Sequence, residues 1–401
     1  MNFFMKLIKN KYLSQTLDKK EAVCLRILSS NEAHIIQDWQ LLWEGVHNFD
    51  DLSQSCKTLM PVIVKYIESK KLLDECFNSV GHLNLSFLRG FPKYFWVKNQ
   101  HLLKNIDLIL SAVHDNIQII AIKGTAEILD SSCVAFYRST RDLDLLVKSV
   151  DIHSLRRILL ELNYYEVIEN KFIKYPFNKT SYYFKSRLNS YLDVDVHVSV
   201  NTELVPDNLT NLFWLNRVPS NTYKNLSVPS NREKFWLAVI NAFMPENWVS
   251  GSYLKYINDA LDYASAFPKE KIQSIVYDGK QLHGLKDWQE QIISLGIVLG
   301  RLQDSYKEEI RTQVAYGSPR LNKHTGVSLE FTRNISISVA SKAMFYKIYY
   351  RLNNYQIAIK RLKKNGYVPG FFTFILFAPL VSAIRGTFSL FKLILFRKYP
   401  S

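Results

Sequence analysis

The hydrophobic pattern of this chain changes its period near residue 117, and this change constrains the fold more than any other feature. Residues 1–115, and the chain from residue 231 onward, space their apolar side chains at helical intervals. Between these regions, β-branched or alternating runs predict strands at Ile117–Ile122, Asp142–Val147, Tyr164–Ile168, Tyr182–Lys185 and Leu192–Val200. With a predicted helix at Ile152–Leu162, residues 117–200 form an α/β unit between two helical regions.

The positive charge of the chain is concentrated at its C-terminal end. The net charge is +15, and residues 331–401 contain twelve Lys or Arg residues and no Asp or Glu. The remaining residues, 39 basic and 36 acidic, carry only +3. An acid-free basic block of this kind favours a polyanionic partner, either nucleic acid or an anionic membrane surface.

The end of this basic block is also amphipathic. Beyond Pro379, Ser382, Arg385, Ser389 and Lys392 recur at helical spacing and form one narrow polar stripe, while aliphatic and aromatic residues occupy the rest. Such a helix lies in a membrane interface or packs on the core of its own protein. Residues 351–364 contain five basic residues and no acid, which favours an anionic membrane. We therefore expect residues 366–401 to bind an anionic membrane surface.

The cysteines and the N-terminal residues bear on the compartment. Cys24, Cys56, Cys76 and Cys133 form no CxxC pair, and the first residues show neither a long apolar run nor a small-residue cleavage site. These features favour four reduced thiols in the cytoplasm. Together with the basic tail, they predict a cytoplasmic protein that is peripheral at the inner face of the membrane.

Two carboxylates lie close together on the second predicted strand. Asp142 and Asp144 are two residues apart, so their side chains project from the same face of a strand. Adjacent carboxylates repel each other, and a hard divalent cation such as Mg²⁺ removes that repulsion. The alternative is a surface strand whose acids pair with Arg138 or Arg141.

A second acidic strand strengthens the metal hypothesis. Between Leu192 and Val198 the pattern alternates strictly, so that Asp193, Asp195 and His197 share one face. If this strand lies near the first, it supplies a third carboxylate to a two-metal site for phosphoryl transfer. We favour Asp195 as the ligand and keep Asp193 in reserve. The alternative is an exposed acidic face with a structural His197.

A glycine turn follows the first predicted strand. Lys123, Gly124 and Thr125 lie between that strand and a predicted helix start. Glycine at such a turn lets the backbone approach a phosphate, and the free N–H groups of a helix N-terminus attract anions. The alternative is ordinary turn chemistry.

These motifs occur in the order Ile119–Gly124, Tyr137-Arg138, Asp142–Val147, Asn163-Tyr164 and Asp195-Val196-His197. In this order they resemble the uncharacterised nucleotidyltransferase family of the DNA polymerase beta-like superfamily. The resemblance runs from about residue 99 to about residue 263 and is strongest between residues 119 and 147. It implies a mixed sheet covered by helices, and transfer of a nucleoside monophosphate from a nucleoside triphosphate to an acceptor.

The resemblance also implies roles for individual residues. Asp142 and Asp144 would hold two Mg²⁺ or Mn²⁺ ions. Asp195 would hold the catalytic metal and help to deprotonate the acceptor. Gly124 and Thr125 would cradle the triphosphate, supported by Lys123 and Arg138.

The expected architecture is α+β, with a small mixed-sheet nucleotidyltransferase core flanked by helical regions and followed by a basic amphipathic tail. The expected boundaries are residues 1–115 for the N-terminal helical region, 116–230 for the core, 231–330 for a second helical region and 331–401 for the tail. A loop is expected over residues 317–328 because of its Gly, Pro and Ser content.

Three functions agree with these features. The first is a metal-dependent nucleotidyltransferase, with a nucleoside triphosphate as substrate and an acceptor from a membrane-linked polysaccharide or glycolipid pathway. The second is a glycosyltransferase whose Asp142-Leu143-Asp144 binds the metal of a nucleotide-sugar. The third is a catalytically degenerate module that binds protein or nucleic acid, for which the affinity would fall steeply with salt.

Overall fold

The computed structural model describes the chain from residue 13 to residue 333 with interruptions. The described residues are 13–81, 83, 85–129, 137–138, 140, 142–167, 181–187, 193–200, 209–220, 223–244, 247, 250–281, 285–302, 320–322 and 326–333. The residues 366–401 of the expected membrane-binding segment lie outside these ranges.

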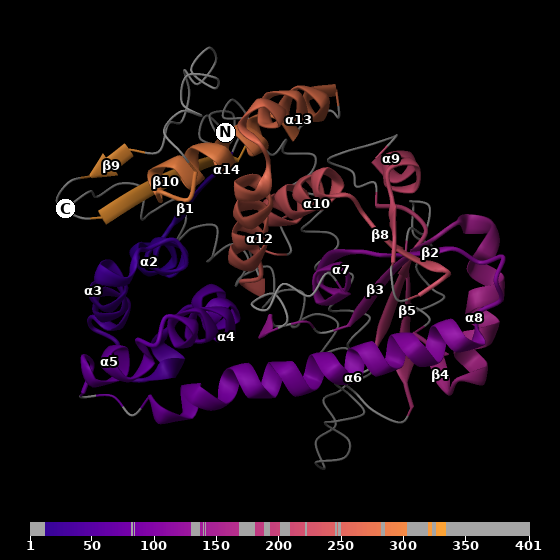
Figure 1. Cartoon of the computed structure of the whole chain (residues 1–401), viewed down its shortest axis with the longest axis horizontal. Coiled ribbons are helices and arrows are strands. Elements are labelled where there is room, and N and C mark those ends of the chain that lie inside the picture. Colours follow the sequence, from indigo (N-terminus) through magenta and orange to yellow (C-terminus); the bar gives the residue numbers. More distant parts are fainter. Residues whose placement is uncertain are drawn as a thin grey trace, which may run out of the picture. The chain divides into compact units, whose positions relative to one another are not determined.

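A mixed sheet is the larger of the two sheets in the described chain and lies on the right of the view in Figure 1. Among the described residues, seven strands lie in the order β4-β5-β6-β3-β2-β8-β7. Their bounds are β2 Ile119–Ala121, β3 Leu143–Val147, β4 Tyr164–Glu166, β5 Ser181–Ser186, β6 Val194–His197, β7 Val218–Pro219 and β8 Leu226–Val228. The β3–β6 and β2–β8 pairs are parallel, and the other pairs are antiparallel.

The five strands predicted between residues 117 and 200 are all present. Two strands of the sheet, β7 and β8, were not predicted because they are too short to show an alternating pattern. The predicted helix after the glycine turn is α7, Lys123–Leu129, which begins at Lys123 itself. The predicted helix at residues 152–162 is α8, Ile152–Glu161.

The two faces of the sheet contribute to two different hydrophobic cores. Leu143, Leu145 and Val147 of β3 face a core that contains apolar residues of α6, Gly90–Ala112, and of α8. Leu146 and Ile120 project from the other face into a core that contains residues of the helical regions. Because side chains alternate along a strand, Asp144 lies on the Leu146 side, toward the helical regions.

The helices on that side come from both ends of the described chain. The N-terminal helices are α2 Lys19–Ile27, α3 Glu32–Trp43, α4 Gln54–Ser69 and α5 Leu73–Asn78, with short 3₁₀ turns η1 Phe49–Asp51 and η2 Ser86–Arg89. The later helices are α9 Leu209–Leu215, α10 Asn231–Phe243, α12 Tyr253–Ala266, α13 Lys269–Gln281 and α14 Leu285–Val298, while η4 Ser149–Asp151 precedes α8. Since α12 packs against both α4 and α10, the N-terminal helices and the later helices share one core (Figure 1).

A small second sheet departs from the predicted pattern. Strand β1, Leu13–Leu17, pairs antiparallel with β10, Gly326–Arg333, which also pairs with β9, Arg320–Asn322. The N-terminal region is therefore not entirely helical. The loop expected over residues 317–328 contains β9 and the start of β10. A strand whose partner lies about 300 residues away leaves no local signal in the sequence.

Two observations bear on the predicted compartment and partners. The thiols of Cys24, Cys56 and Cys76 are free and buried, as predicted. Within the described ranges, no helix combines the length and the apolar character that a membrane crossing requires.

The separation of buried and exposed positions on α8 gives a test of the sheet core. Leu155 is fully buried, whereas Leu160 on the same helix is 46% exposed. Replacing Leu155 by Ala is expected to lower the free energy of unfolding by about 2–5 kcal/mol, because it leaves a cavity. The matched change Leu160→Ala is expected to cost no more than about 0.5 kcal/mol. Urea unfolding followed by circular dichroism measures both, and equal losses would contradict this packing.

Candidate active site

The register of β3 and β6 brings the two acidic strands together. These strands are parallel neighbours, and Asp144 is paired directly with Asp195. Directly paired residues project from the same face of a sheet, and His197, two residues beyond Asp195, does so too. Val194 and Val196 alternate with Asp195 and His197 along β6, and their side chains are fully buried on the opposite face. The predicted proximity of the two strands is therefore confirmed.

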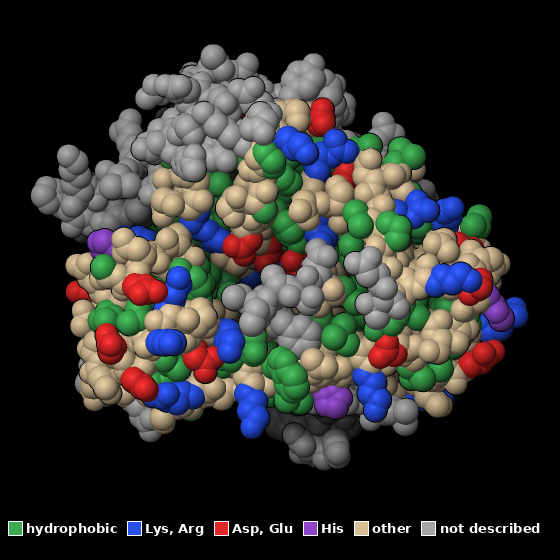
Figure 2. Space-filling model, in the orientation of Figure 1, with side chains coloured by type: hydrophobic (Ala, Val, Ile, Leu, Met, Phe, Trp, Pro, Cys, Tyr) green, Lys and Arg blue, Asp and Glu red, His purple; other side chains and the backbone are tan. Residues whose placement is uncertain are grey.

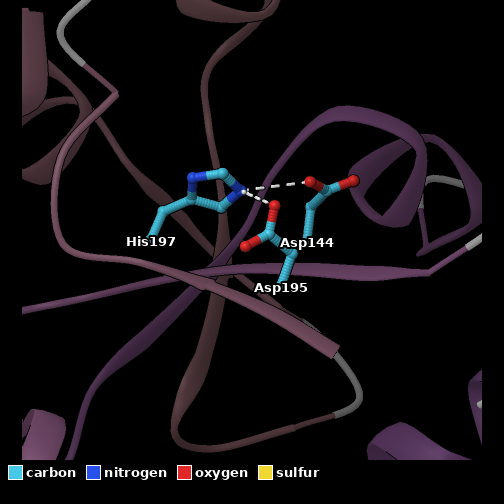
Figure 3. A group of neighbouring side chains, drawn as sticks. All are labelled: Asp144, Asp195 and His197. Atoms are coloured by element: carbon cyan, nitrogen blue, oxygen red, sulfur yellow. Dashed lines mark hydrogen bonds and ion pairs between the residues drawn. The ribbon is translucent and has the colours of Figure 1, made fainter. Parts of the chain in front are cut away.

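The three polar side chains meet in one compact cluster (Figure 3). His197 Nε2 lies 3.2 Å from Asp144 Oδ1 and 3.1 Å from Asp195 Oδ2. One ligand atom from each of the three side chains lies within 4.8 Å of the other two. The imidazole of His197 is thus part of the site and not a remote structural group.

Lys123 supplies a positive charge at this cluster. Its Nζ atom lies 2.7 Å from Asp144 Oδ1 and 3.2 Å from His197 Nε2. The backbone of Lys123 has a φ of +50°, in the left-handed region that a non-glycine residue adopts at a cost. Strain of this kind is frequent at functional sites, and here it occurs at the turn from β2 into α7.

The charges in the cluster act on one another. Burial by itself would raise the pKa of Asp144, but Lys123 and His197 outweigh it and hold that pKa well below its usual range. Burial and the Lys123 charge oppose protonation of His197, yet Asp195 and Asp144 outweigh them and raise its pKa. Asp144 therefore stays ionised, and the Lys123 ammonium balances part of the negative charge of the two carboxylates.

Asp142 lies at the same cleft but outside the compact cluster. It precedes Leu143, the first residue of β3, and it is not one of the three residues whose ligand atoms lie within 4.8 Å of one another. Burial and the Asp144 charge raise the pKa of Asp142 to about 7. The described residues thus bring together Asp144, Asp195 and His197, whereas the sequence pattern grouped Asp142, Asp144 and Asp195.

The cluster has the donor set of a divalent metal site. Asp195 Oδ1 is buried and has no hydrogen-bond partner among the described residues, which leaves one carboxylate oxygen available. Carboxylate oxygens suit Mg²⁺, and an imidazole nitrogen beside them suits Mn²⁺ or other transition metals as well. The acidic group Asp144, Asp195 and His197 can therefore hold a metal ion.

A cleft of about 210 Å³ opens over the acidic residues. One part of its wall belongs to the sheet and the glycine turn, and the other belongs to the start of α12 and the residues before it. The lining residues are Lys123, Gly124, Thr140, Asp142, Asp144, Asp195, Asn247, Ser250, Ser252, Lys255 and Tyr256.

The α12 side of this cleft is suited to an anion. Ser252 is the N-cap of α12, but its hydroxyl accepts no hydrogen bond from the backbone N–H groups of the first turn. Those N–H groups can therefore face a bound anion. The ammonium of Lys255 lies over the ring of Tyr256, and no carboxylate of the described chain forms an ion pair with it. Burial and the nearby Arg138 lower the pKa of Lys255 to about 8. An anion bound here would relieve an unpaired positive charge.

The glycine turn lines the cleft, but its threonine does not. Gly124 borders the cleft, and a Cβ atom there would lie 3.1–3.2 Å from the side chain of Thr140, which makes a larger residue tight. Thr125 is fully buried, and its hydroxyl accepts the backbone N–H of Asp144 at 2.8 Å. Thr125 therefore holds strand β3 in place beneath the cleft.

Arg138 also lies behind the cleft. Its guanidinium is buried and forms an ion pair with Asp259 of α12 at 2.7 Å, while its carbonyl accepts a hydrogen bond from Asn99. A second contact joins α12 to α7, because Tyr263 of α12 donates a hydrogen bond to Glu127 of α7. Both contacts fix α12 on the elements that carry the site.

Several residues of the site carry no signal in the sequence. Lys255, Asp259 and Asp262 recur at helical spacing on α12, a pattern that is typical of a solvent-facing stripe. Only the packing of α12 shows that Lys255 lines the cleft and Asp259 binds Arg138. Asp193, kept in reserve as a ligand, accepts a hydrogen bond from Tyr183 at 2.8 Å and lies outside the cluster.

The comparisons with known proteins identify one domain. Residues 88–286 match the family model described as "uncharacterised nucleotidyltransferase". This range includes α6, the mixed sheet, α10 and α12, and thus every residue that lines the cleft. No curated protein matches the chain.

One solved structure is similar to part of the chain. It is the solution structure of the antibiotic-resistance factor ANT(2'')-Ia, with 13% sequence identity and a TM-score of 0.31. The similarity covers 46% of this chain and 93% of that one.

The geometry predicts which acids bind a metal. Asp144→Asn and Asp195→Asn are each expected to weaken Mn²⁺ binding by more than about 10-fold, since even the loss of an outer partner of a metal ligand costs about that much. Asp193→Asn is the matched control. Asp193 directly precedes β6, accepts a hydrogen bond from Tyr183 of β5 and lies outside the cluster. Isothermal titration with Mn²⁺ gives the three affinities. Equal weakening by Asp193→Asn would contradict the assignment.

Proposed function

Residues 88–286 form a domain of the uncharacterised nucleotidyltransferase family, and from this we propose that the protein transfers a nucleoside monophosphate from a nucleoside triphosphate to an acceptor. The observation that carries the proposal is the direct pairing of Asp144 with Asp195 on adjacent parallel strands. It places two carboxylates in the wall of a cleft large enough for a phosphate chain, with His197 in contact with both.

Mg²⁺ or Mn²⁺ is the proposed metal. Asp144 and Asp195 would hold the ion needed for catalysis, and Asp142, which lines the same cleft, would contribute to a second ion. Metal ions bound here would stabilise the charge on the attacking and leaving oxygens of the displacement. The raised pKa of Asp142 agrees with such a role, because a carboxyl group crowded by burial and by another carboxylate gains most from a cation.

In the proposed reaction, a hydroxyl oxygen of the acceptor attacks the α-phosphorus of the nucleotide. A new oxygen–phosphorus bond forms, the bond from the α-phosphorus to the bridging oxygen breaks, and pyrophosphate leaves. Asp195 is the proposed acceptor of the hydroxyl proton. Lys123 neutralises Asp144 in the absence of substrate and lies where it can also face the triphosphate.

The start of α12 is the proposed site for the phosphates that leave. Lys255 and the N-terminal turn after Ser252 form the positive wall of the cleft, across from the carboxylates. Arg138 contributes through Asp259, because their buried ion pair holds α12 in place. Gly124 lines the same cleft and permits close approach of the substrate.

Metal-dependent transfer is expected to require the paired carboxylates. With α-³²P-labelled nucleoside triphosphates, Mg²⁺ or Mn²⁺ and a membrane extract as the source of acceptor, the protein should label an acceptor and release pyrophosphate. Asp144→Asn should reduce this transfer by at least about 10³-fold, because it removes a charge that acts on the reacting centre. Asp193→Asn should retain transfer.

The same preparation separates nucleotidyl from glycosyl transfer. Nucleoside triphosphates with metal should raise the melting temperature of the wild-type protein by mass action, and nucleotide-sugars should not. Stabilisation by nucleotide-sugars alone would support the glycosyltransferase hypothesis. Transfer that survives Asp144→Asn would contradict the site assignment.

We also propose that residues 366–401 attach the protein to the inner face of an anionic membrane, where a lipid-linked or polysaccharide acceptor would be found. The support is the acid-free, basic composition of residues 331–401 and the narrow polar stripe beyond Pro379. Phosphatidylglycerol vesicles should pellet a larger share of the full chain than of a chain that ends at residue 365. Equal sedimentation of both chains would contradict a role for residues 366–401.

A further inference from the structure

A second basic and apolar surface lies on the folded part of the chain, along α6. This helix of 23 residues is about 34 Å long and buries only one side, with Leu102, Ile106 and Ile109 in the sheet core. The opposite side is exposed along the helix. In Figure 2, hydrophobic, basic and histidine side chains, with a few acidic ones among them, lie over α6 along the lower edge of the view.

The exposed side of α6 has a regular arrangement. Lys93, Val97 and Lys104 recur at intervals of four and seven residues along its middle. Tyr94, 54% exposed, lies at one margin, and Trp96, 43% exposed, lies at the other. Phe87 in the preceding η2 turn and Leu108 near the end of α6 are exposed as well. Apolar side chains exposed in this number on one helix face indicate a binding surface.

The charge of this surface has one sign over most of its length. Between Glu75 and Asp107 the chain contains no acidic residue, whereas it contains Arg89, Lys93, Lys98 and Lys104. Arg89 forms an ion pair with Asp74, while Lys93 and Lys104 are exposed and lie in the acid-free stretch. The part of the surface around Lys93 and Lys104 is therefore complementary to an anionic partner, while the exposed Asp107 lies toward the end of α6.

We propose that the exposed face of α6 docks on an anionic phospholipid bilayer, independently of residues 366–401. Tyr and Trp side chains are favoured at the level of the lipid headgroups, and lysines between them attract anionic lipids. Val97 and Leu108 add aliphatic contacts that a membrane interface accepts. Because stable attachment of a peripheral protein takes two signals, α6 would supply one of them in addition to residues 366–401.

A lipid surface fits this face better than nucleic acid does. Binding of nucleic acid combines basic residues with aromatic rings on which bases stack, and it gains little from exposed Val97 and Leu108. A bilayer contacts aromatic, aliphatic and basic side chains together. It also accepts a long straight helix lying in its plane.

The tryptophans allow α6 to be observed separately from the tail. Residues 331–401 contain no Trp. Among the tryptophans whose side chains the structure describes, Trp39, Trp43 and Trp236 are fully buried, Trp214 is half-buried and Trp96 is the most exposed. We expect phosphatidylglycerol vesicles with brominated acyl chains to quench the fluorescence of the full chain. Trp96→Phe should remove most of this quenching and leave vesicle binding nearly unchanged. Vesicle binding by the full chain with no Trp96-dependent quenching would overturn the proposal, because the tail alone would then make the contact.

Charge variants test the affinity. Replacing Lys93 and Lys104 together by Gln is expected to weaken partitioning onto phosphatidylglycerol vesicles by about 30-fold, from about 1 kcal/mol for each lysine near an anionic surface. Lys19 and Lys271 are exposed on α2 and α13, so the double change Lys19→Gln with Lys271→Gln removes the same charge elsewhere. This control should weaken partitioning by less than about 3-fold.

The same variants decide between partners. Unchanged melting temperatures would show that the surface changes leave the fold intact. Equal weakening by the two double variants would overturn the proposal. It would show that the lysines of α6 act only through the net charge of the protein and not through a contact with the membrane. Vesicle binding that is unaffected by the Lys93 and Lys104 changes, with loss of binding to single-stranded RNA, would overturn it in favour of nucleic acid.

Discussion

The parallel pairing of β3 with β6 is the interaction on which the site depends. It places Asp144 beside Asp195, so that two carboxylates and His197 converge from neighbouring strands on one face of the sheet. Repulsion between these acids has to be offset, and Lys123 does so from a strained turn at the end of β2. The opposite face of the same strands is entirely apolar and packs on α6 and α8. A dry core on one face therefore holds a charged cluster on the other.

The helical region after the sheet is part of the site and not an appendage. Asp259 and Tyr263 of α12 bond to Arg138 and Glu127, which belong to the segments that flank the glycine turn and β3. Buried ion pairs of this kind add little net stability, but breaking one leaves an uncompensated charge. Their value here is positional, because they keep the start of α12 and Lys255 at the cleft. The N-terminal helices support α12 from its other side through α4.

Acidic and basic residues are unevenly distributed along this chain. The acids that matter chemically are few and lie at the cleft, whereas two stretches without acids, residues 76–106 and 331–401, carry basic and aromatic side chains. The first includes most of α6, which uses one side for the sheet core and leaves the other exposed. The proposed transfer to an acceptor at a membrane would use both a metal-binding cleft and these basic segments.

The sequence by itself indicated the strands between residues 117 and 200, the flanking helices and Asp142, Asp144 and Asp195 as candidate ligands. It could do so because strict alternation and helical spacing are local patterns, and because carboxylates on one face of a strand have a clear chemical meaning. Only the tertiary structure decided which residues meet. The parallel register of β3 and β6 brings His197 into contact with Asp144 and Asp195. Asp142 lies just before β3 and is not part of this cluster. Packing also placed polar residues of α12, such as Asp259, against buried partners, and it paired β1 with β10. Neither could be predicted from the sequence, because a contact between distant segments changes the hydrophobic pattern of neither segment.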